Sequence, residues 1–166
     1  LTSQFFANVY LNELDYFVKQ KLKAKYYIRY VDDFVLLHSS KKQLEQWKKE
    51  INDFLKEKLK LELHQDKTKI IPLSEGIDFV GFRNFYYFRL LRKRNIKRIK
   101  NKLLIFEQRQ KELTYDEIYA AFEGWLSYSR NANTYKLRKK MVKKFEKIFP
   151  NELADVQIRR WLKYIK

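Results

Sequence analysis

The chain has 166 residues, 45% of them hydrophobic and 17% aromatic, and its 37 Lys and Arg outnumber its 20 Asp and Glu to give a formal charge of +17. That apolar content can fill the core of one domain or two small ones, which excludes a wholly disordered chain. With no Cys, disulfide frameworks and thiolate zinc sites are excluded, and only two His leave almost nothing for an imidazole metal cluster, so any metal site must use carboxylates.

The first segment predicts a helix followed by a β-hairpin. The helix is expected over residues 2–21, because Thr and Ser stand at its start and apolar residues recur at helical spacing. Its expected buried face consists of Phe6, Val9, Tyr10 and Leu14. Two β-rich runs, residues 26–30 and 34–38, then flank Val31, Asp32 and Asp33, which predicts a hairpin with an acidic tip.

A second helix and several short strands complete the first half. Ser39 and Ser40 precede an amphipathic helix that ends near Leu59. Its apolar positions at helical spacing are Leu44, Trp47, Ile51 and Leu55. The remaining pattern predicts strands around 61–63 and 69–71, a turn at 74–76, and a hairpin over 77–82 and 85–90.

From Arg92 onward the apolar spacing is wholly helical and predicts a small bundle. The apolar positions of its three helices are Ile96, Ile99, Leu103 and Phe106, then Ile118, Phe122 and Trp125, then Leu137, Met141 and Phe145. Pro150 ends the third helix, and residues 151–166 are expected to form a final one. The predicted fold class is therefore α+β, with an antiparallel domain over 1–91 and an all-α domain over 92–166.

Positive charge is concentrated in the second predicted domain. Residues 1–91 hold 16 basic and 12 acidic side chains, whereas residues 92–166 hold 21 and 8. Each Lys or Arg laid against a phosphate releases counterions, so this asymmetry favours a nucleic acid partner. A merely solvated basic face is the plainer alternative, and acidic lipid is disfavoured because no apolar anchor accompanies the basic runs. The candidate residues for contacts with the nucleic-acid backbone are Arg92, Lys93, Arg94, Lys97, Arg98, Lys139 and Lys140.

The string YIRYVDDFVLLH, residues 27–38, places two carboxylates at the tip of a hydrophobic hairpin. Adjacent Asp side chains repel each other unless a cation compensates their charge. Nucleotidyl transfer needs such acids, since two divalent ions roughly 3.5–4 Å apart stabilise the attacking oxygen and the leaving pyrophosphate. The plainer alternative is a solvated turn, in which Asp is common.

A third carboxylate is needed for this chemistry. Neighbouring residues of a tight hairpin point in different directions, so Asp32 and Asp33 are not expected both to bridge one pair of ions. Asp15, Asp66 and Asp78 are the candidates, although each also fits a plainer role on a helix surface, in a turn or at a strand edge.

Four ordered blocks resemble the later palm motifs of a reverse transcriptase. They are LTSQFFANVYLNELD at 1–15, the acidic turn at 30–33, LELHQDKTKI at 61–70 and GIDFVGF at 76–82. The resemblance is to the bacterial branch that includes group II intron and retron enzymes, and Ser3-Gln4 is most similar to the enzymes of diversity-generating retroelements. The basic helices from Arg92, with GWLSYSR at 124–130, resemble the family's thumb.

The resemblance implies a partial palm of antiparallel strands and packed helices followed by a thumb bundle. It implies an RNA-directed DNA polymerase that adds a deoxynucleotide from dNTP to a DNA primer on an RNA template. Two Mg²⁺ ions would be the cofactor, with one set of ligands outside this chain. An accessory protein of the retroelement is a further implied partner, and the gene would be bacterial or phage-borne.

Individual roles follow from the same resemblance. Asp32 would be a catalytic metal ligand, Asp33 its partner or orienting carboxylate, and Lys67 the proton donor to departing pyrophosphate. The implied nucleotide or primer contacts are Gln4, Tyr30, Val31, Gly81 and Phe82. Plainer alternatives remain open: a capping amide for Gln4, an exposed turn lysine for Lys67 and a core residue for Phe82. The aromatic rings of Tyr86, Tyr87 and Tyr135 are interpreted as packing residues rather than as stacking platforms for nucleotides.

Family members carry fingers and a first palm block, with another catalytic aspartate, upstream of where this chain starts. The chain begins at Leu1 rather than Met, so we expect that residues upstream have been removed and that the chain alone does not polymerise. A non-catalytic, maturase-like RNA-binding module and an RNA-templated RNA polymerase are the alternatives. No membrane span or secretory leader is recognised, so a cytoplasmic location is expected.

Overall fold

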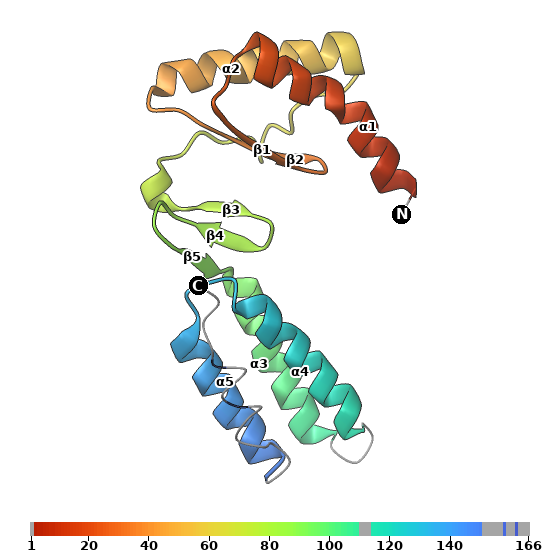
Figure 1. Cartoon of the computed structure of the whole chain (residues 1–166), viewed down its shortest axis with the longest axis vertical. Coiled ribbons are helices and arrows are strands. Elements are labelled where there is room, and N and C mark those ends of the chain that lie inside the picture. Colours follow the sequence, from red (N-terminus) through yellow and green to blue (C-terminus); the bar gives the residue numbers. More distant parts are fainter. Residues whose placement is uncertain (1, 110–113, 151–157, 159–161, 163–166) are drawn as a thin grey trace. The chain divides into compact units, whose positions relative to one another are not determined.

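The computed structural model describes residues 2–109, 114–150, 158 and 162, and the chain divides into two compact units, Leu1–Pro72 and Leu73–Lys166 (Figure 1). The first unit contains α1 (Thr2–Tyr16), a π-helical turn (Phe17–Lys21), β1 (Tyr26–Tyr30), β2 (Asp33–Leu37), α2 (Lys41–Phe54) and a second π-helical turn (Leu55–Leu59). The second contains a 3₁₀ turn (Leu73–Glu75), β3 (Ile77–Phe79), β4 (Phe82–Asn84), β5 (Arg89–Leu91), α3 (Lys93–Gln108), α4 (Tyr115–Ser129) and α5 (Tyr135–Ile148).

In the first unit, α1 and α2 lie on one side of the β1–β2 hairpin (Figure 1). The antiparallel register pairs Tyr27 with Leu36 and Arg29 with Phe34, which places these four side chains on the face toward the helices. The buried core beneath them consists of Leu14, Val18, Ala24, Trp47, Ile51, Leu55 and Leu59. The predicted hairpin and the predicted apolar face of the second helix are confirmed, and Ser40 caps α2 by accepting a hydrogen bond from the backbone N–H of Gln43.

The predicted buried face of α1 is wrong for most of its length. Leu14 is buried, but Phe6 is 66% and Val9 56% exposed. The core of the unit is reached only from Leu11 onward, so the described residues of the unit leave the side chains of Phe6 and Val9 uncovered. Tyr10 is half exposed, and its hydroxyl donates a hydrogen bond to the carbonyl of Leu59 at 2.7 Å.

The strands predicted around 61–63 and 69–71 are also wrong, because that segment is irregular. Side chains of α2 form hydrogen bonds with backbone groups of this segment, which a neighbouring strand would otherwise pair. The amide oxygen of Asn52 accepts from the N–H of Leu63 at 3.2 Å, and the ammonium of Lys48 donates to the carbonyl of Thr68 at 3.1 Å. The segment after α2 is therefore a loop that hydrogen bonds attach to this helix, although its composition is typical of strands.

The second unit opens with a three-stranded antiparallel sheet in the order β3-β4-β5 (Figure 1). The turn predicted at 74–76 is present as the 3₁₀ turn and the left-handed Gly76. The hairpin predicted over 77–82 and 85–90 differs, because the chain already reverses at Val80 and Gly81, whose φ angles are 47° and 83°. Three short strands therefore replace the two longer ones.

The three helices of the second unit run alongside one another, and the predicted bundle is confirmed (Figure 1). Its buried core consists of Ile99, Leu103, Phe106, Ile118, Phe122, Leu126, Met141, Val142 and Phe145. Phe122 stacks on Phe145 with 4.4 Å between ring centroids, and Thr114 and Glu117 form a capping box at the start of α4. The final helix predicted over 151–166 lies outside the described residues except for Ile158 and Leu162, which pack against the core.

The mixture of helices and antiparallel sheets confirms the α+β class. The palm and thumb assignments and the domain boundary at 91/92 stay predictions. Nowhere in the described parts of the chain is a helix both long and apolar enough to cross a bilayer.

Candidate active site and nucleic-acid interface

The acidic turn lies at the tip of the β1–β2 hairpin. Tyr30 pairs with Asp33, so Val31 and Asp32 form a two-residue connection and Asp33 is the first residue of β2. Asp33 shares the hairpin face that points away from the helices. Both carboxylates are exposed, and within the described ranges neither accepts a hydrogen bond or forms an ion pair. Two adjacent, unpartnered carboxylates are suited to binding a hard divalent cation.

Val31 stands in a strained backbone conformation. Its φ is +56°, in the left-handed region, which a β-branched residue rarely adopts. Such strain costs about 1–3 kcal/mol and persists only where surrounding contacts impose it. One such contact is a hydrogen bond of 2.7 Å from the Arg29 guanidinium Nη1 to the carbonyl of Val31.

Arg29 fastens this turn to α1. Its Nε donates to Oδ1 of Asp15 at 2.8 Å and its Nη2 to Oδ2 at 2.5 Å, the paired geometry that favours Arg over Lys. The same guanidinium donates to Oδ1 of Asn8 at 2.9 Å, and the Tyr27 hydroxyl donates to Oδ1 of Asp15 at 2.6 Å. We call Asp15, Tyr27 and Arg29 the clamp. The clamp holds the acidic turn and α1 in one fixed arrangement.

Arg29 was not among the functional residues predicted from the sequence. A signal was present, because alternation places this charged residue on the same strand face as Tyr27, which packs against the core. A charge on the inner face of a strand requires a partner, and α1 supplied the acid.

The ionisation of the clamp follows from its contacts. Burial alone raises the pKa of Asp15, but hydrogen bonds from Arg29 and Tyr27 and the charge of Arg29 outweigh it, so the pKa lies below its ordinary value. Burial and the hydrogen bond to Asp15 raise the pKa of Tyr27. The hydrogen bond to Asp15 raises the pKa of Arg29 against the opposing effect of burial.

We expect the clamp to make the first unit sensitive to acid. Because folding lowers the pKa of Asp15, its stabilisation is complete above the unfolded value near 3.9 and is lost as pH falls through the folded value. At pH 7, Asp15→Asn should lower the free energy of unfolding by about 1.5–3 kcal/mol, and this difference should shrink as the pH falls below the ordinary pKa of an Asp side chain. Urea unfolding followed by circular dichroism at several pH values measures it. Glu13→Gln, at an exposed site on the same helix, is the control, and an equal loss at all pH values would contradict the expectation.

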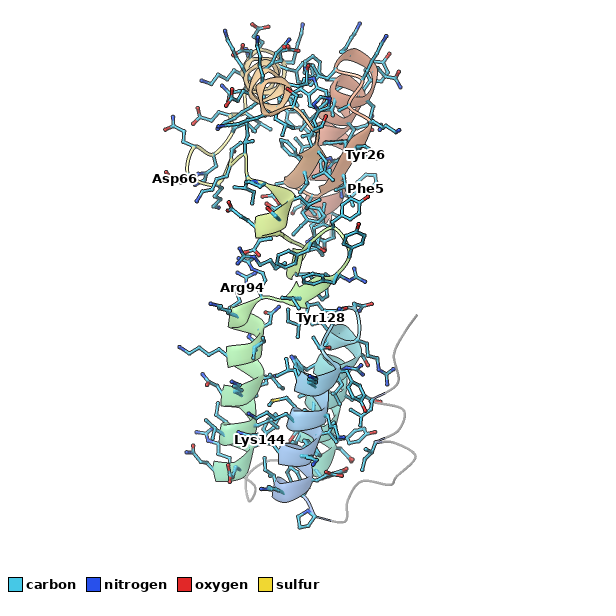
Figure 2. The ribbon with its side chains drawn as sticks, turned by 90° about the vertical axis from the view of Figure 1, so that its left-hand side faces the viewer. Phe5, Tyr26, Asp66, Arg94, Tyr128 and Lys144 are labelled. Atoms are coloured by element: carbon cyan, nitrogen blue, oxygen red, sulfur yellow. The ribbon has the colours of Figure 1, made fainter. Side chains whose placement is uncertain are left out.

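Each candidate for a third carboxylate has its own setting within its unit. Asp15 belongs to the clamp, Asp78 pairs with Arg92 at 3.1 Å in the second unit, and Asp66 lies on the loop after α2 (Figure 2). Among the residues that the structure describes, no group of three His, Cys, Asp or Glu is placed to hold a metal. Asp32 and Asp33 therefore fit part of a magnesium site, and the described residues do not complete it.

The other predicted nucleotide and primer contacts are spread over both units. Gln4 on α1 and Lys67 in the loop are exposed, and within the described residues neither forms a hydrogen bond or an ion pair with the acidic turn. Gly81 forms the β3–β4 turn, where its carbonyl accepts a hydrogen bond from the Asn95 amide at 3.2 Å. Phe82 is 8% exposed and its ring stacks on that of Tyr128, which is labelled in Figure 2, with 4.8 Å between centroids. The side chain of Phe82 therefore belongs to the core of the second unit.

Most of the side chains predicted to contact the nucleic-acid backbone are exposed to solvent on the basic helices. The exposed residues are Lys93, Arg94, Lys97, Arg98, Lys139 and Lys140, and Arg94 marks the first turn of α3 in Figure 2. Arg92 is partly buried and pairs with Asp78, whereas Arg138 is wholly buried within the bundle. The packing interpretation of Tyr86 and Tyr87 is wrong, because these side chains are 75% and 90% exposed.

Comparison with known proteins gives one family and several relatives. Residues 1–84, about half of the chain, match the sequence profile of a family described as reverse transcriptase (RNA-dependent DNA polymerase). Protein YkfC of Escherichia coli is 43% identical over 70 residues, which are 42% of this chain and 17% of that protein. The group II intron-encoded protein LtrA of Lactococcus lactis is 38% identical over 80 residues, 48% of this chain and 13% of that protein. A putative COX1/OXI3 intron 2 protein of Saccharomyces cerevisiae is 33% identical over 64 residues, 38% of this chain and 8% of its own length.

Proposed function

Because this chain belongs to the reverse transcriptase family, we propose that its acidic turn forms part of the catalytic centre of an RNA-directed DNA polymerase. The observation that carries the proposal is the pair of exposed, unpartnered carboxylates at a strained turn that the clamp fixes in place. The matched segment spans 17% or less of the relatives named above, so the activity is proposed for a longer enzyme that contains it. The finer similarity to diversity-generating retroelement enzymes stays a prediction.

In this proposal Asp32 and Asp33 would hold magnesium, and the remaining ligands would come from outside the described residues. Bound magnesium supplies the positive charge that stabilises the attacking 3′-oxygen and the departing pyrophosphate. Arg29 and Asp15 would keep the two carboxylates in position, and Tyr30 on the outer face would lie toward the primer end. The ammonium of Lys67 would donate a proton to pyrophosphate only after the loop on which it lies is brought to the turn.

The chain alone is expected not to extend a primer, because the described residues bring no third metal ligand to the turn. The measurement is extension of a labelled DNA primer on an RNA template by the 166-residue chain with Mg²⁺ and dNTPs. The longer enzyme should extend the same primer, and parallel reactions with rNTPs test the RNA polymerase alternative. Extension by the chain alone would contradict the expected inactivity, and no extension by the longer enzyme would contradict the proposed function.

The basic helices would hold the template–primer duplex by its phosphates. Reversing the charge of Arg94, Lys97 and Arg98 to Glu should weaken duplex binding for every sequence. The slope of log K against log salt should also fall by about 0.9 for each phosphate that the protein no longer neutralises. Fluorescence anisotropy at several salt concentrations measures both effects.

The control removes the same amount of charge elsewhere, by changing Lys42, Lys49 and Lys58 of the first unit to Glu. These lysines are exposed and lie outside the basic helices. Equal losses of affinity for the two triple variants would show that only total charge matters and that the helices are a solvated face.

A non-catalytic RNA-binding module is the second candidate. It is favoured by the absence of a third carboxylate near the acidic turn within the described residues. The two candidates differ in what Asp32 does, because a binding module needs no metal ligand there. Equal RNA binding and no measurable synthesis by the longer enzyme, with or without Asp32, would favour this second candidate.

A further inference from the structure

The β4–β5 connection exposes two tyrosines at a well-defined turn. We call residues 85–88 the aromatic loop. The N–H of Phe85 donates to the carbonyl of Phe88 at 2.8 Å, and their rings stack with 4.6 Å between centroids. Between them, Tyr86 and Tyr87 are 75% and 90% exposed, with ring centroids 4.5 Å apart in an edge-to-face pair. The turn presents these rings to solvent instead of packing them.

The aromatic loop forms one wall of a hollow. An open cavity of about 390 Å³ lies between the loop with its flanking residues and the α4–α5 turn, residues 130–133. The N–H of Asn133 donates to the carbonyl of Arg89 at 2.9 Å, which fastens the two walls together. The charged side chains that line the hollow are Arg89 and Arg130, and no Asp or Glu of the described residues lines it.

These features match the chemistry of an unpaired nucleotide. An aromatic ring binds the face of a base by stacking, and guanidinium groups pair with phosphate. Inside a duplex both faces of a base are covered by its neighbours, so an internal paired base has no free face to stack on a tyrosine, whereas an unpaired base has. We propose that the hollow binds an unpaired nucleotide of a single strand, with its base against Tyr86 or Tyr87 and its phosphate near Arg89 and Arg130.

A protein partner is less favoured by the same residues. Tyr and Arg also anchor protein interfaces, but there they surround apolar pockets, whereas half of the ten residues that line this hollow are Asn or Arg. The unit itself carries 23 Lys and Arg against 10 Asp and Glu over residues 73–166, which favours a polyanion. This proposal does not depend on catalysis at the acidic turn, so either one can fail without the other.

The test measures binding of labelled oligo-dT and oligo-U of about twelve nucleotides, and of a blunt duplex, to the full chain by fluorescence anisotropy. Changing both Tyr86→Ala and Tyr87→Ala should weaken single-strand binding about tenfold and leave duplex binding and the salt slope unchanged, because no charge is removed. Changing both tyrosines to Phe should preserve binding, since the rings remain. If the double Ala variant loses affinity for oligo-dT alone, the hollow binds DNA, and if it loses affinity for oligo-U alone, the hollow binds RNA.

Tyr16→Ala is the matched control, because Tyr16 is 60% exposed and lies in the first unit. Thermal unfolding should be the same for all variants, since the substituted rings contribute little to the core. Unchanged single-strand binding by the double Ala variant would overturn the proposal and would favour a protein as the partner that binds in the hollow. An equal loss for single strands and duplex would overturn it as well.

Discussion

Substituting Asp32 by Asn in the longer enzyme is expected to abolish nucleotide addition while leaving duplex binding intact. Asn keeps the size of the side chain but removes the charge, and a metal ion contributes several kcal/mol of transition-state stabilisation. Loss of about 4 kcal/mol corresponds to about a thousandfold slower chemistry. The measurement is single-turnover primer extension at saturating dNTP, together with anisotropy of a bound template–primer duplex.

The control for this experiment is Asp53→Asn, which removes one exposed carboxylate from α2. Asp33→Asn should also slow synthesis, and comparing the two variants across Mg²⁺ concentrations separates a direct ligand from an orienting carboxylate. Removing a direct ligand raises the Mg²⁺ concentration needed for half-maximal rate. Unchanged synthesis by the Asp32 variant would remove the catalytic proposal, and a parallel loss of duplex binding would assign the residue a structural role.

Gly81→Ala is expected to destabilise the second unit by about 2–5 kcal/mol. The φ of Gly81 is +83°, a conformation that costs a residue with a Cβ about 1–2 kcal/mol. An added Cβ would also collide with the hydroxyl oxygen of Tyr128, and overpacking of this kind costs about 1–3 kcal/mol. Urea unfolding of the full chain measures the shift of the midpoint. Loss of the native turn would also displace Phe82 from its stack on Tyr128.

Two further variants separate strain from collision. Tyr128→Phe removes the colliding oxygen, and the nearest ring carbon then lies 3.3 Å from the added Cβ, so Gly81→Ala should cost less in that background. Gly124→Ala is the matched control, because nothing lies within 4 Å of its added Cβ and the site is in the middle of α4, where Ala is favoured by about 1 kcal/mol. An equal cost of Gly81→Ala in both backgrounds would contradict the collision and leave only backbone strain.

The acidic turn illustrates how far local pattern reaches. Apolar β-rich runs on both sides of the Asp pair are a short-range signal, so the hairpin and its acidic tip were predictable. The role of Arg29 was not, because it depends on α1, which is brought to the hairpin by folding of the whole unit. Pairing of Asp15 with Arg29 also changed Asp15 from a candidate metal ligand into a structural partner.

Surface exposure was the least predictable property. Apolar spacing placed Phe6 and Val9 in a core that α1 reaches only further along its length, and it treated Tyr86 and Tyr87 as packing residues although the β4–β5 turn exposes them. Periodicity reports which residues share a face of an element. It does not report whether another element covers that face.

By itself, the sequence determined the basic C-terminal helices, the amphipathic α2, the bundle core and the acidic hairpin tip, because helical and strand periodicity and net charge are local properties of the chain. The tertiary structure decided three things: the clamp on the turn, the irregular path of the segment where strands were predicted around 61–63 and 69–71, and the hollow beside the aromatic loop. Each of them joins residues far apart in the chain, and such pairings are set by packing and by the need to satisfy buried polar groups.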